Sequence, residues 1–350
     1  MDTKIEDILY FYNCPCEVAG TRQNAVYTDF FLNPINGTTL KRLQSRVSDF
    51  SLLIGAAVAI VIENGALILR VQTGKAQTYN FFEYCQNLES VSGSLALGIN
   101  SNGGFVSSNL FSMPHLLVCG ATGSGKSVFI HNCIVSLAMN KGVCFTLIDL
   151  KRVELSIYNG CNFVNDRVIT DPETAERVLL SEVLEMESRY KLMERYKVRH
   201  YTQLPPNKQL LARIIVIDEL ADLLLNKATR KSVENSIVRI AQLGRAAGCH
   251  LILATQRPSR EVVTGLIKAN IPSRIAFKTA TAIDSRVIGI QGAELLRGRG
   301  DCIYHGGDCI EPQRLQGFYI SDKDLQTVIN QTKQKQAPKQ RRGFFKSLFL

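Results

Sequence analysis

The stretch that decides the fold is residues 120–127, which read Gly120-Ala121-Thr122-Gly123-Ser124-Gly125-Lys126-Ser127. They fit the phosphate-binding pattern G-x-x-x-x-G-K-[ST], in which glycines let backbone N–H groups approach nucleotide phosphates. An apolar run precedes the pattern and a helical one follows it, which is the context that confirms such a loop. Lys126 is expected to reach the β- and γ-phosphates, and the Ser127 hydroxyl to bind Mg²⁺ at the helix N-terminus. The stretch therefore predicts ATP and Mg²⁺ as cofactors, with all eight residues in the binding loop.

A second apolar run, residues 213–217, leads into two acids, Asp218 and Glu219. In α/β sheets ligands bind at the carboxyl ends of strands, so both side chains are expected near the phosphates. We expect Asp218 to hold the Mg²⁺ shell and Glu219 to act as the general base that polarises the attacking water. The plainer alternative is a pair of acids that only ends a strand. With the phosphate-binding loop upstream, the pair predicts an enzyme that hydrolyses ATP.

Two further residues give weaker signals. Gln256 follows another apolar run and is predicted to lie near the γ-phosphate as a sensor, although strand ends are often polar. Arg245 ends a helix just before that run, where an arginine can cap the helix or reach into a neighbouring subunit. The residues alone leave both roles of Arg245 open. Cys302, His305 and Cys309 have a metal-like spacing but no fourth ligand nearby, so buried thiols and a loop histidine are the better interpretation.

Around the loop, apolar runs of strand length alternate with amphipathic helices, which is typical of a mostly parallel sheet with crossover helices. The runs are residues 115–119, 143–149, 213–218, 250–255 and 274–279. The clearest helix should begin after Asp171 as N-cap, with Pro172 in its first turn. Its inward face is predicted to be Val178, Leu179, Val183, Met186, Tyr190 and Met193. The pattern predicts an α/β fold.

The pattern also divides the chain into four parts. Residues 1–25 have no clear period and are interpreted as an N-terminal arm. Residues 26–112 suggest a smaller α+β domain, with a helix at 39–49 and strands at 58–62 and 66–71. Residues 113–330 form the predicted ATPase domain. Residues 331–350, rich in Gln and Lys and then in aromatics, are predicted to be a basic disordered tail.

Charge and cysteine content indicate which partners the chain could bind and in which compartment it works. The net charge is +10, and six cations without an acid follow Gln331: Lys333, Lys335, Lys339, Arg341, Arg342 and Lys346. The tail is a candidate DNA tether, membrane-surface anchor or partner peptide, and we favour docking on a recruiting partner or loading onto DNA. The ten cysteines lack framework spacing and no secretory signal is visible, so we expect a cytoplasmic protein. The most apolar stretch, residues 52–62, is too short to cross a bilayer, and no transmembrane anchor is predicted.

Taken together, these motifs resemble the motor portion of the FtsK/SpoIIIE family of DNA translocases. The likeness runs from about Val26 to Ile329 and is densest in residues 113–118, 155–158, 185–193, 218–223, 244–248, 254–259, 264–277 and 284–286. It implies a RecA-like P-loop domain behind a smaller domain, assembled into a six-membered ring through which duplex DNA passes. Arg245 then matches the family's arginine finger, which acts on the neighbouring subunit. Lys268 and Arg286 match positions that face DNA and would contact its phosphates, and Lys278 is a candidate by proximity only.

The chain departs from the family pattern at several positions. Leu150 stands where a proline is usual, Ala282 where a channel lysine is common, and Arg297 and Arg299 make a glycine-rich turn unusually basic. We therefore expect the DNA contacts to be distributed differently. The family's membrane-spanning N-terminus and C-terminal winged helix are not recognised in the sequence, so we expect recruitment by a partner.

The predicted function is ATP-driven translocation of double-stranded DNA by a homo-hexameric ring that serves a mobile element, plasmid or phage. The alternative is a protein-secretion ATPase of the related P-loop class, although those usually carry several ATPase domains in tandem and a membrane anchor. A third hypothesis is a nucleotide-regulated scaffold that assembles without turnover. The intact set of Lys126, Asp218, Glu219 and Arg245 argues against that scaffold.

Overall fold

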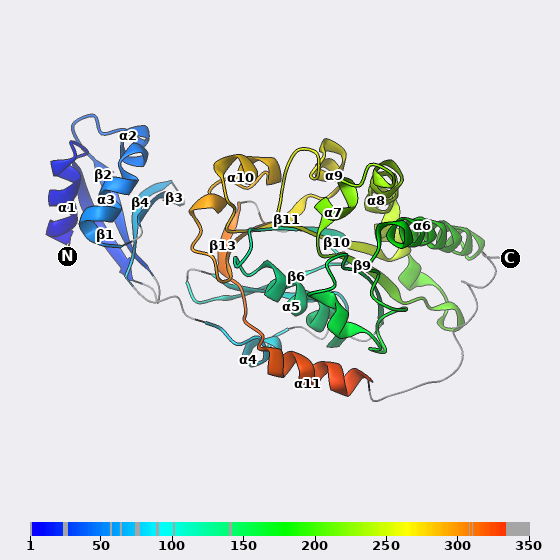
Figure 1. Ribbon diagram of the computed structural model, residues 1–350. Helices are drawn as coiled ribbons and strands as arrows, with labels where there is room; N and C mark the ends of the chain where they lie inside the picture. Colours follow the sequence, from blue (N-terminus) through cyan, green and yellow to red (C-terminus); the bar gives the residue numbers. More distant parts are fainter. Residues whose placement is uncertain are drawn as a thin grey trace. The chain divides into compact units, whose positions relative to one another are not determined.

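The computed structural model describes residues 2–23, 27–56, 58–63, 65–73, 78–88, 91–100, 102–139, 142–307, 309 and 311–333. The chain forms two compact units (Figure 1). The smaller unit is Met1–Thr78 with Ser101–Gly104, and the larger is Tyr79–Asn100 with Phe105–Leu350. Each has a sheet of its own, so each buries its own core.

The smaller unit is a four-stranded antiparallel sheet, in the order β1-β2-β4-β3, accompanied by three helices in its described part. Its elements are α1 (Asp2–Phe11), β1 (Cys16–Gln23), β2 (Tyr27–Pro34), α2 (Leu40–Ser45), α3 (Val47–Ile54), β3 (Val58–Glu63) and β4 (Ala66–Gln72). Leu9, Phe30 and Phe50 are buried at its centre. The buried carboxylate of Asp29 accepts hydrogen bonds from Arg70 Nε at 2.6 Å and Nη2 at 2.8 Å, which satisfies a charge inside this small core.

The smaller unit differs from the expected one at its start. Residues 1–25 are not a separate arm, because α1 and β1 contribute Ile5, Leu9 and Cys16 to the core. Two apolar residues four apart in a ten-residue helix make too short a stripe to stand out in the sequence. The helix expected at 39–49 is two helices, α2 and α3, divided at Arg46. The strands predicted at 58–62 and 66–71 are confirmed as β3 and β4.

The larger unit has a nine-stranded sheet in the order β6-β5-β13-β12-β11-β7-β10-β9-β8. Its strands are β5 (Ser94–Asn100), β6 (Phe105–Asn109), β7 (His115–Cys119), β8 (Val143–Ile148), β9 (Ala212–Ile217), β10 (Cys249–Thr255), β11 (Ser273–Phe277), β12 (Asp301–His305) and β13 (Gln313–Gln316). The five strands β11-β7-β10-β9-β8 are parallel, and the others pair antiparallel. These five are the predicted apolar runs, within two residues at each end. The predicted α/β class with a mostly parallel ATPase sheet is therefore confirmed.

Helices cover both faces of this sheet. They are α4 (Phe81–Cys85), α5 (Lys126–Met139), α6 (Pro172–Arg195), α7 (Leu220–Leu224), α8 (Arg230–Ala247), α9 (Gly265–Asn270), α10 (Ala282–Ile288) and α11 (Asp322–Lys333), with short 3₁₀ turns at Leu155–Tyr158, Tyr201–Gln203, Pro206–Lys208 and Ala293–Leu295. α5 and α11 pack into one core cluster, and α6, α7, α8 and α9 into another. In Figure 1, α5 and α11 accordingly lie on the other side of the strands from α7, α8 and α9. Asp171 caps α6 as predicted, because its Oδ1 accepts a hydrogen bond from Thr174 N at 2.8 Å.

Two expected boundaries of the ATPase domain also lie elsewhere. β5 and β6 belong to the larger sheet rather than to a domain ending at residue 112, because β5 pairs with β13 through Leu315 and Gln316. That pairing joins segments about two hundred residues apart, so no local pattern announces it. At the other end, residues 331–333 complete α11 instead of beginning the tail. The remaining tail, residues 334–350, lies outside the described residues.

Candidate nucleotide-binding site

The P-loop, residues 120–127, joins β7 to α5 at the carboxyl end of the parallel strands. Gly120 N donates to Thr255 O at 3.2 Å, and Ala121 N donates to Lys278 O at 2.8 Å, so the ends of the two neighbouring strands hold the loop. Gly125 has a φ of +107°, and a Cβ there would lie 2.5 Å from Gly300 N. Only glycine therefore fits at this position.

Lys126 and Asp218 meet at the base of the loop. The Lys126 ammonium donates to Asp218 O at 2.8 Å and to Asp218 Oδ1 at 3.1 Å, and both residues are only 3% exposed. Burial raises the pKa of Asp218, while the nearby Lys126 ammonium opposes that shift. The pair with Asp218 holds the Lys126 side chain next to the glycine-rich backbone, where phosphates would bind.

The donor set at this position fits a magnesium nucleotide. The Ser127 hydroxyl and the Asp218 carboxylate supply the hard oxygen ligands that Mg²⁺ prefers. Glu154, which the sequence analysis missed, has its Oε2 3.6 Å from His131 Nε2, and its interactions with His131 first and then with Ser127 lower its pKa. Ser124 Oγ is buried and has no hydrogen-bond partner among the described residues, as expected of a group that a bound phosphate would satisfy. Glu154 belongs to no recognisable motif, because it lies in the loop after β8 and only folding brings it near the P-loop.

Glu219 is held in one orientation by three neighbours. Its Oε1 accepts hydrogen bonds from Thr255 Oγ1 at 2.6 Å and Ala221 N at 3.3 Å, and its Oε2 accepts one from Gln256 N at 2.9 Å. Lys151 Nζ lies 3.6 Å from the same Oε2. The carboxylate is 5% exposed and lies beside the end of β10, a position suited to a general base that must not rotate.

Gln256 connects this carboxylate to the P-loop. Its backbone N–H bonds to Glu219, and its side-chain Oε1 accepts a hydrogen bond from Thr122 Oγ1 at 3.1 Å. Thr122 is exposed in the P-loop, so this contact lies on the surface of the loop. The structure therefore brings together Lys126, Asp218, Glu219 and Gln256, as the sequence analysis expected.

Arg245 lies near the amino ends of the parallel strands, whereas the P-loop lies at their carboxyl ends. It is exposed in the last turn of α8, which ends at Gly248 just before β10 begins. β10 runs parallel to β7, with Leu251 opposite His115 and Thr255 opposite Cys119, so its start is remote from the P-loop. β10 has seven residues, and at about 3.3 Å per residue they separate the two ends of the parallel strands by roughly 20 Å. Arg245 cannot reach the P-loop of its own chain, and its side chain has no hydrogen-bond or ion-pair partner in the part of the chain that the structure describes.

The three predicted DNA-contacting residues separate into two groups. Arg274 donates to Lys268 O at 2.7 Å and to Ile288 O at 3.1 Å, which joins the ends of α9 and α10 and so keeps Lys268 close to Arg286. Lys278 instead follows β11, where its carbonyl accepts from Ala121 of the P-loop. Lys278 therefore lies beside the candidate nucleotide site and not with the other two.

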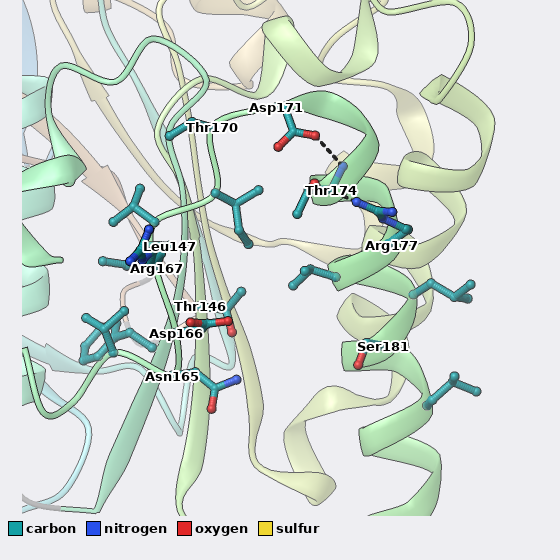
Figure 2. Close-up of a pocket in the computed structure, with 17 residues that line it drawn as sticks. Thr146, Leu147, Asn165, Asp166, Arg167, Thr170, Asp171, Thr174, Arg177 and Ser181 are labelled. Atoms are coloured by element: carbon teal, nitrogen blue, oxygen red, sulfur yellow. Dashed lines mark hydrogen bonds between the residues drawn. The ribbon is translucent and has the colours of Figure 1, made fainter. Parts of the chain in front are cut away.

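A separate pocket of about 480 Å³ lies between β8 and the first turns of α6 (Figure 2). Figure 2 shows Arg167 and Asp166 on one side of it and Arg177 and Ser181 of α6 on the other. None of its lining residues belongs to the P-loop or to the acidic pair after β9.

Cys302, one of the three residues with metal-like spacing, is buried in β12, and burial raises the pKa of its thiol.

Sequence comparisons identify the group of proteins with this site. The model of the FtsK/SpoIIIE family matches residues 86–212 and 202–260. The DNA translocase FtsK of Caldanaerobacter subterraneus subsp. tengcongensis is 40% identical over 343 residues, which are 93% of this chain and 48% of the relative. The DNA translocase FtsK of Lactiplantibacillus plantarum is 38% identical over 356 residues, 95% of this chain and 44% of the relative. The chain thus spans about half the length of these curated relatives.

Solved structures share the fold. The pCW3 conjugation coupling protein TcpA, in its monomer form with ATPγS, has a TM-score of 0.69 at 21% identity, over 94% of this chain and 98% of that chain. The cytoplasmic domain of the Thermomonospora curvata type VII secretion ATPase EccC has a TM-score of 0.61 at 21% identity, over 75% of this chain and 35% of that chain. In the described residues, no helix has the length and apolar character needed to span a membrane. With the family model matched through both the P-loop and the acidic strand end, and with relatives aligned over nearly the whole sequence, this chain belongs to the FtsK/SpoIIIE family.

Proposed function

We propose that this chain binds and hydrolyses ATP with Mg²⁺ and uses the energy to translocate double-stranded DNA as a ring of identical subunits. The observation that carries the proposal is the convergence of Lys126, Asp218, Glu219 and Gln256 on one P-loop. A binding protein without turnover has no need of a carboxylate immobilised by Thr255 and Gln256 beside that loop. The relatives named as DNA translocases support DNA as the substrate.

In the proposed mechanism the residues divide the work by position. Lys126 and the P-loop backbone bind the β- and γ-phosphates, and Ser127 and Asp218 hold Mg²⁺, which neutralises charge on those phosphates. Glu219 orients the attacking water and accepts its proton, while Gln256 senses the γ-phosphate through Thr122. Arg245 reaches the site of the next subunit, because its own P-loop lies across the sheet.

The decisive experiment is ATP hydrolysis by the purified chain with and without duplex DNA. We expect duplex DNA to stimulate hydrolysis and an unfolded polypeptide to leave it unchanged. The competing function is polypeptide export, which the shared fold of the secretion ATPase EccC favours. Stimulation by a polypeptide and not by DNA would support export. ATP binding without any turnover would support the scaffold instead.

We further predict that Lys268 and Arg286 contact DNA phosphates. Replacing each by Ala should weaken duplex binding about equally for all sequences, and should lower the slope of log affinity against log salt by about one per residue. Arg195→Ala is the matched control, because Arg195 is exposed at the end of α6, away from α9 and α10. An unchanged salt slope in the double variant would remove both residues from the DNA path.

We also propose that the chain serves a mobile element. TcpA, which shares the fold over nearly the whole chain, is a conjugation coupling protein, and this is consistent with service to a mobile element. The cytoplasmic location and the recruiting role of the tail stay predictions. Because α11 runs to Lys333, a truncation that tests the tail should end there and not at Asn330.

A further inference from the structure

The turn before β12 contains two arginines that the proposed function has not used. Arg297 has a structural partner: its Nε lies 3.1 Å from Asp301 Oδ2, and its Nη2 donates to Gln316 Oε1 at 3.3 Å. Arg314 also binds Asp301, at 2.9 and 2.6 Å, so this almost fully buried carboxylate anchors the turn to the sheet. The turn is therefore rigid, and Arg297 is part of what makes it so.

This turn packs directly against the P-loop. Gly300 N donates to Ser124 O at 2.8 Å. A Cβ placed on Gly125 would lie 2.5 Å from Gly300 N and 3.5 Å from the carbonyl carbon of Arg299, so the two backbones are in contact. The same turn approaches the P-loop again at Gly298, where a Cβ would lie 3.8 Å from Gly123 O. The backbone of this turn, on both sides of Arg299, therefore lies against the P-loop backbone that is expected to bind phosphate.

Arg299 holds that position at a conformational cost. Its φ is +51°, in the left-handed region, between Gly298 at +87° and Gly300 at +92°. Glycine adopts this conformation freely and arginine does not, and strained residues of this kind cluster at functional sites. Its side chain is exposed and, in contrast to Arg297 and Arg314, makes no hydrogen bond or ion pair among the described residues. The strain is thus not compensated by any polar contact of the guanidinium within the described chain.

We propose that Arg299 donates hydrogen bonds to the phosphates of the nucleotide bound in the P-loop of the same chain. The inference rests on the proposed function, because it requires ATP at that loop. Guanidinium groups bind phosphate oxygens through paired N–H donors, and a rigid turn leaves only the side chain to be ordered on binding. Lys278 adds charge on this side, since its Cδ lies 3.8 Å from a Cβ placed on Gly298. The P-loop is then bordered by acids on the β9 and β10 side and by cations on the β11 side.

The test removes the charge without disturbing the turn. Arg299→Gly and Arg299→Asn both suit a positive φ, so the backbone of the turn should be kept. We expect each variant to bind a fluorescent ATP analogue roughly 10-fold or more weakly, as for loss of a hydrogen bond to a charged group. The melting temperature of the nucleotide-free chain should stay equal or rise, while the shift on adding ATP should shrink. Arg299→Lys should recover part of the affinity.

Controls separate this inference from the function on which it rests. Arg195→Ala, which removes an exposed arginine at the end of α6, should leave ATP affinity unchanged. If the unaltered chain binds no ATP, the proposed function fails. If that chain binds ATP and Arg299→Gly binds it within twofold, only the role of Arg299 fails. A variant that keeps ATP affinity and loses duplex affinity would place Arg299 on the DNA path, as the sequence first suggested, and would overturn the inference.

Discussion

Glu219→Gln should leave ATP binding intact and lower ATP turnover by about 10²-fold or more, because the amide cannot accept the proton of the attacking water. The replacement is nearly isosteric, and two of its three local bonds can be kept, while the amide NH₂ at the Oε1 position no longer accepts from Ala221 N. The amide oxygen can accept from Gln256 N, and the amide NH₂ can donate to Thr255 Oγ1, which accepts as well as donates. Folding and nucleotide affinity are therefore expected to change little. The measurement is steady-state hydrolysis together with a binding constant for ATP.

The matched control is Glu187→Gln, which removes an exposed carboxylate from α6, where Glu187 only pairs with Arg239 at 3.5 Å. That variant should hydrolyse ATP at the normal rate. Near-normal turnover in Glu219→Gln would mean that another group activates the water. Glu154 would then be the next residue to replace, since Ser127 of the proposed Mg²⁺ site is among the groups that lower its pKa.

Arg245→Ala and Lys126→Ala should each inactivate the chain alone, yet regain part of the activity when the two variants are mixed. Loss of an arginine finger typically lowers turnover by roughly 10³-fold or more. In a mixed ring, an Arg245→Ala subunit still has its P-loop, and its neighbour still has Arg245. The expected complementation rests on the sheet, because Arg245 lies at the strand ends opposite its own P-loop and is proposed to act on another chain. ATPase activity across a series of mixing ratios measures the effect.

A stricter mixture serves as the control for this experiment. Arg245→Ala subunits mixed with the double variant Arg245→Ala/Lys126→Ala contain no Arg245, so they should stay inactive at every ratio. If no mixture of the two single variants exceeds its parents, Arg245 does not complete a neighbouring site. Its role would then be that of a cation in the last turn of α8, where its loss costs about 0.3–1 kcal/mol of stability and no catalysis.

The local chemistry of the nucleotide site could be predicted from the sequence. A P-loop depends on glycine conformation and on a helix N-terminus, and both are properties of neighbouring residues. The five parallel strands and the cap of α6 at Asp171 likewise depend on short sequence patterns, so the bounds of these elements could be predicted within two residues. Gln256 was placed at the site because strand ends of a parallel sheet share one edge.

The rest needed the tertiary structure, because it depends on contacts between segments far apart in the chain. The pairing of β5 with β13 extends the larger sheet, and the loop after β8 brings the acid Glu154 to within 3.6 Å of His131 in α5. Neither has a local signal. The sequence shows that Arg245 and Arg299 are present, but it does not show how far each lies from the P-loop. Only the folded sheet puts Arg245 at the strand ends opposite its own P-loop, because β7 and β10 run parallel. It also sets the turn of Arg299 against that loop, where Gly300 N donates to Ser124 O.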